Sequence, residues 1–151
     1  MDKQASRGLR ACLLQVVAAL VLTTVTLAPA QAAEPVKVVY HLSEGLDQAS
    51  RSLANIRNHL RADPSTKIVV VTHGDGIKFL IDGALDRNGK PYDAAVGALA
   101  SAGVEFRVCE NTLLARSIPA DKLLLDAKIV PSGVAEVARL QAREGFVYLH
   151  P

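Results

Sequence analysis

The fold of this chain is decided by the stretch Val104-Glu-Phe-Arg-Val-Cys-Glu-Asn-Thr-Leu-Leu-Ala-Arg-Ser-Ile118. Its first residues alternate between apolar and charged side chains, which predicts a strand from Val104 to Val108. The residues from Asn111 onward predict the opening of a helix. Cys109 therefore lies where the carboxyl end of a strand meets the amino end of a helix. The unpaired N–H groups and partial positive charge of a helix start favour a thiolate over a thiol.

A second interpretation of Cys109 is that it is a small buried apolar residue, as free cysteines commonly are. The local pattern leaves both interpretations open. In α/β folds, ligand-binding and catalytic residues lie at the carboxyl ends of strands, and this position supports the interpretation of Cys109 as a reactive thiol.

The amino-terminal segment has the three parts of a secretory signal peptide. Lys3, Arg7 and Arg10 are basic, residues 11–27 form an apolar run, and residues 28–33 are mostly small. We expect cleavage after Ala32, with residues 1–32 as the signal peptide and residues 33–151 as the mature domain. A membrane anchor is the alternative, but the apolar run is short for a membrane span. We therefore expect a periplasmic or secreted protein with no stable membrane span after cleavage.

Removal of residues 1–32 changes both the charge and the cysteine content of the chain. This segment holds three of the 17 basic groups and one of the 15 acidic groups, so 14 of each remain. A neutral domain without a basic patch argues against nucleic acid as a partner. Cys12 leaves with the segment, and Cys109 becomes the lone cysteine of the mature chain. Such a cysteine is buried, paired with another chain, or a reactive thiol.

Strand and helix patterns alternate along the mature chain, and there is no internal repeat or second domain. We expect strands at 37–42, 67–72, 104–108, 128–130 and 146–149. Helix faces occur at 46–60, 92–102 and 132–143, the last with Val134, Val137, Ala138 and Leu140 pointing inward. This alternation predicts a single three-layer α/β/α domain with a mostly parallel sheet of about five strands.

The strand ends of a parallel sheet share one edge, and ligands bind there. That edge collects most of the chemistry-bearing residues of the mature chain: His41, His73, Cys109, Ser132 and His150. An imidazolium close to a thiolate is a known way to activate the nucleophile. His73 is the first candidate for that role and His41 the second, and a hydrogen bond to a loop carbonyl is the alternative for each.

Three other residues complete these expectations. Asn111 and Thr112 are candidates to donate hydrogen bonds to a bound sulfur anion, or simply to cap the helix. His59 falls inside the first helix and is expected to be a solvated surface residue.

The sequence gives little support to a hydrolase, a dinucleotide-binding protein or a metalloprotein. No G-x-S-x-G nucleophile elbow is present. Gly74-Asp75-Gly76 lacks the third glycine of the dinucleotide fingerprint, because Phe79 stands there. No close-spaced metal-ligand pair occurs, so we expect neither a resident metal nor a cofactor. A metal- or small-ligand-binding module using His41, His73 and Cys109 stays open as an alternative, since thiolate and imidazole suit copper or zinc.

The run from Val108 to Ile118, preceded by Gly103-Val104, resembles the DsrE/DsrF-like (sulfur-relay) family. So does the earlier layout of a strand, a long helix and a Val-rich strand that ends in His73-Gly74. The resemblance implies a single-domain α/β fold in which Cys109 carries sulfane sulfur as a persulfide. A sulfur donor or acceptor protein, or a small sulfur species, is then the implied partner. The resemblance also implies a homo-oligomer, either a trimer or a hexamer.

The chain departs from the well-known members of this family in two ways. Those members are cytoplasmic, whereas this chain has an export signal. Glu110-Asn111 also stands where small residues often follow the cysteine. We therefore expect an exported sulfur-handling protein, with its enzymatic status open between carrier and sulfurtransferase component. A non-catalytic oligomeric interaction protein with an inert Cys109 is the remaining alternative.

Overall fold

The computed structural model describes residues 34–151. The predicted signal peptide lies outside the described residues. Within residues 34–151, no helix has the length and apolar character that a membrane crossing requires.

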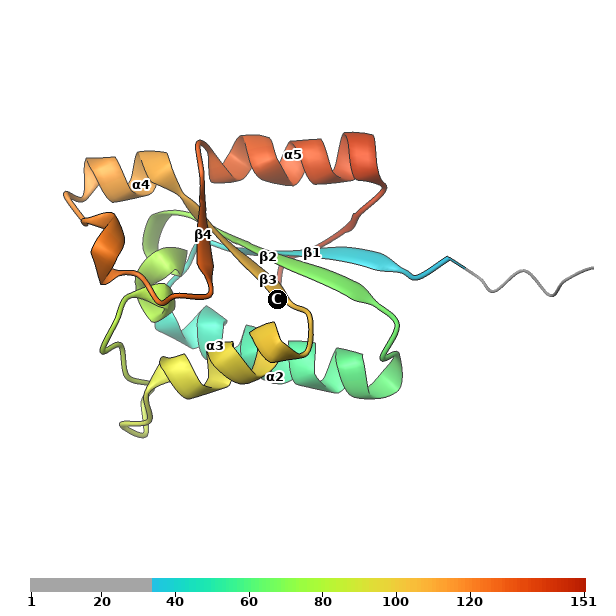
Figure 1. The fold of residues 1–151 in the computed structure, drawn as a ribbon, viewed down its shortest axis with the longest axis horizontal. Coiled ribbons are helices and arrows are strands. Elements are labelled where there is room, and N and C mark those ends of the chain that lie inside the picture. Colours follow the sequence, from blue (N-terminus) through green and yellow to red (C-terminus); the bar gives the residue numbers. More distant parts are fainter. Residues whose placement is uncertain (1–33) are drawn as a thin grey trace, which may run out of the picture. The chain divides into compact units, whose positions relative to one another are not determined.

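The described domain is built on a five-stranded parallel sheet with the order β4-β3-β2-β1-β5 (Figure 1). The predicted strands are confirmed to within about one residue at their ends. Their bounds are β1 Lys37–Leu42, β2 Lys67–Thr72, β3 Glu105–Cys109, β4 Ala127–Val130 and β5 Val147–Leu149. Strand β2 is central, and its run of β-branched residues is buried on both faces, as expected for a parallel sheet.

Helices lie on both faces of the sheet and form the predicted three layers (Figure 1). One face is covered by α2 (Leu46–Ala62), the 3₁₀ helix η1 (Gly74–Leu80) and α3 (Tyr92–Ser101). The other face is covered by α5 (Gly133–Glu144). The short helices α4 (Glu110–Ala115) and η2 (Ala120–Lys122) follow β3 at the carboxyl edge.

The two faces bury very different amounts of apolar surface. The α2/α3 face holds the main core, which includes Phe79, Phe106 and Ile56. The α5 face holds a small cluster formed by Val39, Val69, Val71, Val137 and Leu140. The domain formed by residues 34–151 therefore has one dominant core and a thinner second layer.

The prediction that Val134 and Ala138 point inward is wrong. Val134 is 63% exposed and Ala138 is also exposed, whereas Val137 and Leu140 are buried. Because α5 packs on the sheet with one narrow stripe and nothing in the described chain covers its outer side, only that stripe is buried.

The expectation for His59 is also wrong. This side chain is partly buried, and its Nδ1 lies 3.0 Å from the hydroxyl of Tyr40. The carboxyl end of α2 packs against β1, so the hydroxyl of Tyr40 lies within hydrogen-bond distance of the His59 ring.

Candidate functional site

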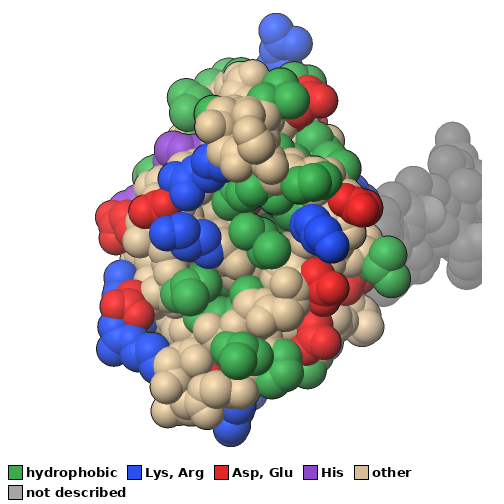
Figure 2. Space-filling model, turned by 90° about the vertical axis from the view of Figure 1, so that its left-hand side faces the viewer, with side chains coloured by type: hydrophobic (Ala, Val, Ile, Leu, Met, Phe, Trp, Pro, Cys, Tyr) green, Lys and Arg blue, Asp and Glu red, His purple; other side chains and the backbone are tan. Residues whose placement is uncertain are grey.

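The carboxyl edge of the sheet brings together the residues that the sequence places at strand ends. Cys109 ends β3, and its partner in the register of β4 is Val130. His73 directly follows β2, and its ring centroid lies 4.7 Å from that of His41. The rings of His41 and His150 are 5.8 Å apart. In Figure 2, which faces this edge, imidazole side chains lie at one margin among charged and apolar neighbours.

Cys109 caps the amino end of α4 with an extended backbone conformation. Its side chain is buried, with 5% of the residue exposed. Burial is the largest influence on the pKa of the thiol and raises it, but hydrogen bonds outweigh that effect. These bonds come from the backbone N–H of Gly133, from the hydroxyl and N–H of Thr112, and from the N–H of Asn111. The net result is that the pKa of Cys109 is lower than that of an ordinary thiol.

Gly133 is the residue of this site that the sequence analysis missed. It is the first residue of α5, and a β-carbon placed on it would lie 3.2 Å from Cβ of Cys109 and 3.3 Å from Cβ of His73. Gly133 therefore packs closely against Cys109 and His73. Its backbone N–H, at the amino end of α5, donates a hydrogen bond to the sulfur of Cys109. The predicted N-cap is confirmed, because Oγ of Ser132 accepts a hydrogen bond from the N–H of Ala135 at 3.4 Å. Ser132 predicted from the sequence where α5 begins, but it did not indicate that the start of α5 lies close to Cys109.

Thr112 and Asn111 contribute in different ways. The hydroxyl oxygen of Thr112 accepts a hydrogen bond from the N–H of Gly74 at 3.1 Å, which leaves its proton free to point at Cys109. Asn111 has an exposed side chain and acts on the thiol through its backbone N–H. Glu110 is exposed and does not share the buried surroundings of the sulfur.

His41, His73 and His150 form a cluster with Tyr148 at the same edge of the sheet as Cys109. Nδ1 of His41 lies 2.8 Å from the hydroxyl of Tyr148, and its Nε2 is buried without a hydrogen-bond partner in the structure. Burial, together with the charges of His73 and His150, lowers the pKa of His41 to about 4. Burial also lowers the pKa of His73. Both rings are therefore neutral at neutral pH, which favours hydrogen bonding over the ion pairing expected of His73.

The cluster does not have the arrangement of a metal centre. Across residues 34–151, no group of three or more His, Cys, Asp or Glu side chains is placed to hold a metal ion. The hydrogen-bond donors around Cys109 are instead suited to an anion, because they present N–H and O–H groups to the sulfur.

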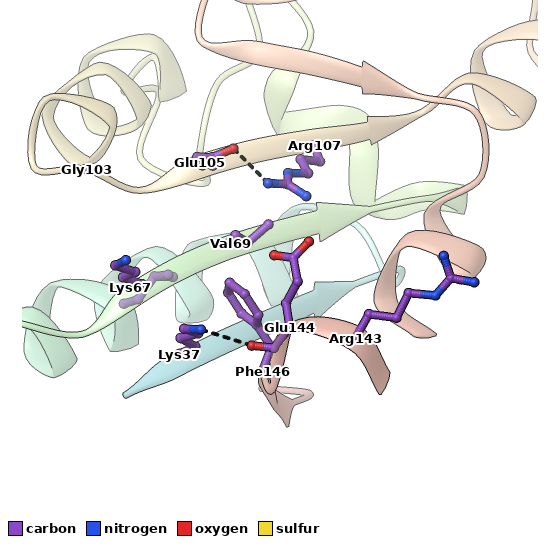
Figure 3. Close-up of a pocket in the computed structure, with 10 residues that line it drawn as sticks. Lys37, Lys67, Val69, Gly103, Glu105, Arg107, Arg143, Glu144 and Phe146 are labelled. Carbon is purple, nitrogen blue, oxygen red and sulfur yellow. Dashed lines mark hydrogen bonds and ion pairs between the residues drawn. The ribbon is translucent and has the colours of Figure 1, made fainter. Parts of the chain in front are cut away.

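A hollow lies on the α5 face, at the ends of the strands opposite to the carboxyl edge (Figure 3). Its volume is about 610 Å³, and Lys67, Arg143 and Phe146 are among the residues that line it. The guanidinium of Arg107 is paired with Glu105 in this hollow, and Lys37 donates to the carbonyl of Glu144. Two of the basic side chains that line the hollow, Arg107 and Lys37, therefore already have partners within the protein.

The parallel sheet and the donor-lined thiol at its carboxyl edge define the class, which is an α/β protein with one buried strand-end cysteine. The chain belongs to the DsrE/DsrF-like family, whose model matches residues 23–151. This match begins within the predicted signal peptide.

Solved structures agree with the fold. The chain is similar to a protein of unknown function, MTH1491, from Methanobacterium thermoautotrophicum, with 31% identity and a TM-score of 0.67. It is also similar in fold to the ychN protein from E. coli, with 12% identity and a TM-score of 0.59. Each comparison covers 77% of this chain and 99% of the other. Among curated proteins, none matches this chain.

Proposed function

We propose that this protein is an exported sulfur carrier that holds sulfane sulfur as a persulfide on Cys109. The observation that carries the proposal is the set of donors around the sulfur, above all the N–H of Gly133, which lower the pKa of a buried thiol. Family membership agrees with it, because the resemblance to sulfur-relay proteins implies this role for the strand-end cysteine.

The transfer needs no external oxidant when the donor is itself a persulfide. The Cys109 thiolate attacks the outer sulfur of R–S–SH, forms a new S–S bond and expels R–S⁻. The product is Cys109–S–SH. The thiolate of an acceptor then attacks the outer sulfur, and the Cys109 thiolate leaves. The Cys109 thiolate is the reactant of the first step and the leaving group of the second. The hydrogen-bond donors around Cys109 stabilise this thiolate and therefore assist both steps.

The residues around Cys109 position its sulfur and the bound persulfide, and they form no covalent bond with either. Thr112 donates to the sulfur, and the N–H of Gly74 fixes the orientation of its hydroxyl. His73 follows β2, the neighbour of the strand that ends in Cys109, and we assign it as the acceptor of the proton of an incoming thiol. The ring of His41 lies next to it, with the two centroids 4.7 Å apart.

Mass spectrometry after treatment with an organic persulfide tests the carrier proposal. We expect a gain of about 32 Da on Cys109, one sulfur atom, which dithiothreitol removes. Cys109→Ser is the matched control and gains nothing. An unmodified Cys109 under conditions that load a free thiol peptide of the same sequence would refute the proposal.

Export is the second part of the proposal, and it rests on the three-part pattern of residues 1–33. Amino-terminal sequencing of the protein recovered from the periplasm or medium tests it. We expect a chain that begins at Ala33, whereas an uncleaved cytoplasmic chain would contradict export without affecting the chemistry of Cys109.

A further inference from the structure

The hollow on the α5 face has no part in the chemistry of Cys109. It is lined by residues at the amino ends of β1, β2 and β3, whereas Cys109 ends β3 at the opposite edge of the sheet (Figure 3). Its volume of about 610 Å³ lies within the range of about 300–1,000 Å³ that is usual for small-molecule sites. The hollow is therefore large enough to take a small organic ligand.

Two lysines lie next to each other in this hollow. Lys37 and Lys67 are direct partners in the parallel register of β1 and β2, and Figure 3 shows them extending from these neighbouring strands. Both are on the α5 face, because Val39 and Val69, two residues further along each strand, pack in the α5 cluster. Like charges at opposite positions of neighbouring strands destabilise a sheet. An anion between the two ammonium groups would remove that repulsion.

The carboxylates of the protein do not neutralise these lysines. The two that line the hollow, Glu105 and Glu144, are already paired with arginines. Lys37 donates to a main-chain carbonyl, that of Glu144. Over residues 34–151, no carboxylate lies within ion-pair distance of Lys37, Lys67 or Arg143. The hollow therefore carries positive charge that the described chain leaves uncompensated.

An aromatic ring lies beside the two lysines (Figure 3). Phe146 follows Gly145, which ends α5 in the left-handed conformation, and the N–H of Phe146 donates to the carbonyl of Leu140 at 3.1 Å. This turn holds Phe146 against the α5 cluster, where its side chain is half-buried and lines the hollow. Val69, which is 4% exposed, lines it as well. The hollow thus offers apolar contact next to positive charge.

We propose that this hollow binds a small organic anion, with its oxyanion head between Lys37 and Lys67 and its apolar body against Phe146 and Val69. Ammonium groups act as point charges, so a carboxylate, a sulfonate or a phosphate head satisfies them. The ring of Phe146 favours a ligand with an aromatic or hydrocarbon body over a bare inorganic anion. Because the site lies at the opposite edge of the sheet from Cys109, its occupation does not depend on persulfide chemistry.

Titration of the purified protein with naphthalene-2-sulfonate, followed by the amide chemical shifts in heteronuclear NMR spectra, tests this site. We expect saturable shifts around Lys37, Lys67 and Phe146 and none around Cys109. Methanesulfonate has the same head without the ring, and we expect it to bind at least roughly tenfold more weakly, because the ring buries more than two CH₂ equivalents of apolar surface.

Lys67→Gln is the most direct variant, because Lys67 is exposed and its removal leaves no buried partner unpaired. We expect it to bind naphthalene-2-sulfonate about two- to fivefold more weakly, as loss of one partly solvated charge contact implies. It should be no less stable than the wild type, since it removes the repulsion from Lys37. Lys67→Arg keeps the charge and should bind as the wild type does. Lys122→Gln is the matched control, because Lys122 is also exposed but lies on η2.

Three results would each overturn the proposal. They are shifts that do not localise to the hollow, equal affinity for methanesulfonate and naphthalene-2-sulfonate, and an affinity of Lys67→Gln equal to that of Lys122→Gln. Persulfide loading of Cys109 is measured separately, so failure of this site is distinct from failure of the carrier proposal.

Discussion

A methyl group added at Gly133 tests how the site lowers the pKa of Cys109. It would lie 3.2 Å from Cβ of Cys109, 3.2 Å from the carbonyl oxygen of Thr72 and 3.3 Å from Cβ of His73. All three atoms are fixed by the backbone at strand ends, so the first turn of α5 has to move instead. Such overpacking costs about 1–3 kcal/mol. The better helix propensity of alanine returns at most about 1 kcal/mol.

We therefore expect Gly133→Ala to lower the free energy of unfolding by about 1–2 kcal/mol, which is roughly 4–8 °C in Tm. The same movement takes the N–H of Gly133 away from the sulfur of Cys109. Loss of that hydrogen bond raises the pKa of the thiol, because the bond favours the thiolate. Alkylation of Cys109 by iodoacetamide, followed against pH, should shift to higher pH and slow at neutral pH.

Gly97→Ala provides the matched control for this experiment. Gly97 lies within α3, and the nearest atom to an added methyl is a carboxylate oxygen of Asp126 at an ordinary 3.7 Å. We expect it to be unchanged or up to about 1 kcal/mol more stable, with the alkylation profile of the wild type. The reasoning fails if Gly133→Ala matches the wild type in both stability and alkylation profile.

Three further predictions concern positions around the sheet. A methyl at Gly76 would lie 2.2 Å from the carbonyl oxygen of Leu42, so Gly76→Ala should give no soluble folded protein; a wild-type circular dichroism spectrum would contradict this. Hydrogen bonds from Arg139 are the main reason that the pKa of Glu136 falls to about 2. The wild type should therefore lose on the order of 2 kcal/mol of stability as pH falls from about 4.5 to 2, a step that denaturant titrations of Glu136→Gln should lack. The pKa of His41 is about 4 through burial and neighbouring imidazoles, so its NMR signals should titrate there, and the fold should weaken as pH falls from about 6.5 toward 4.

The strands could be predicted because their residues carry the information locally. The β-branched run from Ile68 to Val71 has few other stable placements than a strand covered on both faces. The alternation from Val104 to Val108 likewise places Phe106 and Val108 in the core. The parallel arrangement then puts His73 and Cys109 at one edge, and the structure agrees with that placement.

Asn111 and Thr112 follow Cys109 closely in the sequence and could be predicted as donors, but the third donor to the sulfur, Gly133, could not. Gly133 is distant from Cys109 in the sequence and reaches it only through the crossover after β4. Strand order decides which helix start meets which strand end, and hydrophobic periodicity does not contain strand order. The inward assignment of Val134 failed for a related reason, because periodicity does not show how wide a stripe the sheet will cover.

The denaturant dependence of Cys109 labelling distinguishes a sulfur carrier from a protein with an inert structural thiol. With 5% of the residue exposed, a reagent reaches the sulfur only after some opening of the structure. If the opening is local, for example at the short helix α4, little surface is exposed and the alkylation rate hardly changes in low urea. If global unfolding is required, the rate rises steeply with urea, by the full equilibrium m value of about 1–3 kcal/mol per molar. A carrier must exchange sulfur while folded, so we expect a nearly flat dependence below the unfolding transition. A slope equal to that of global unfolding would show that Cys109 is inert in the folded protein, and the persulfide proposal would then fail.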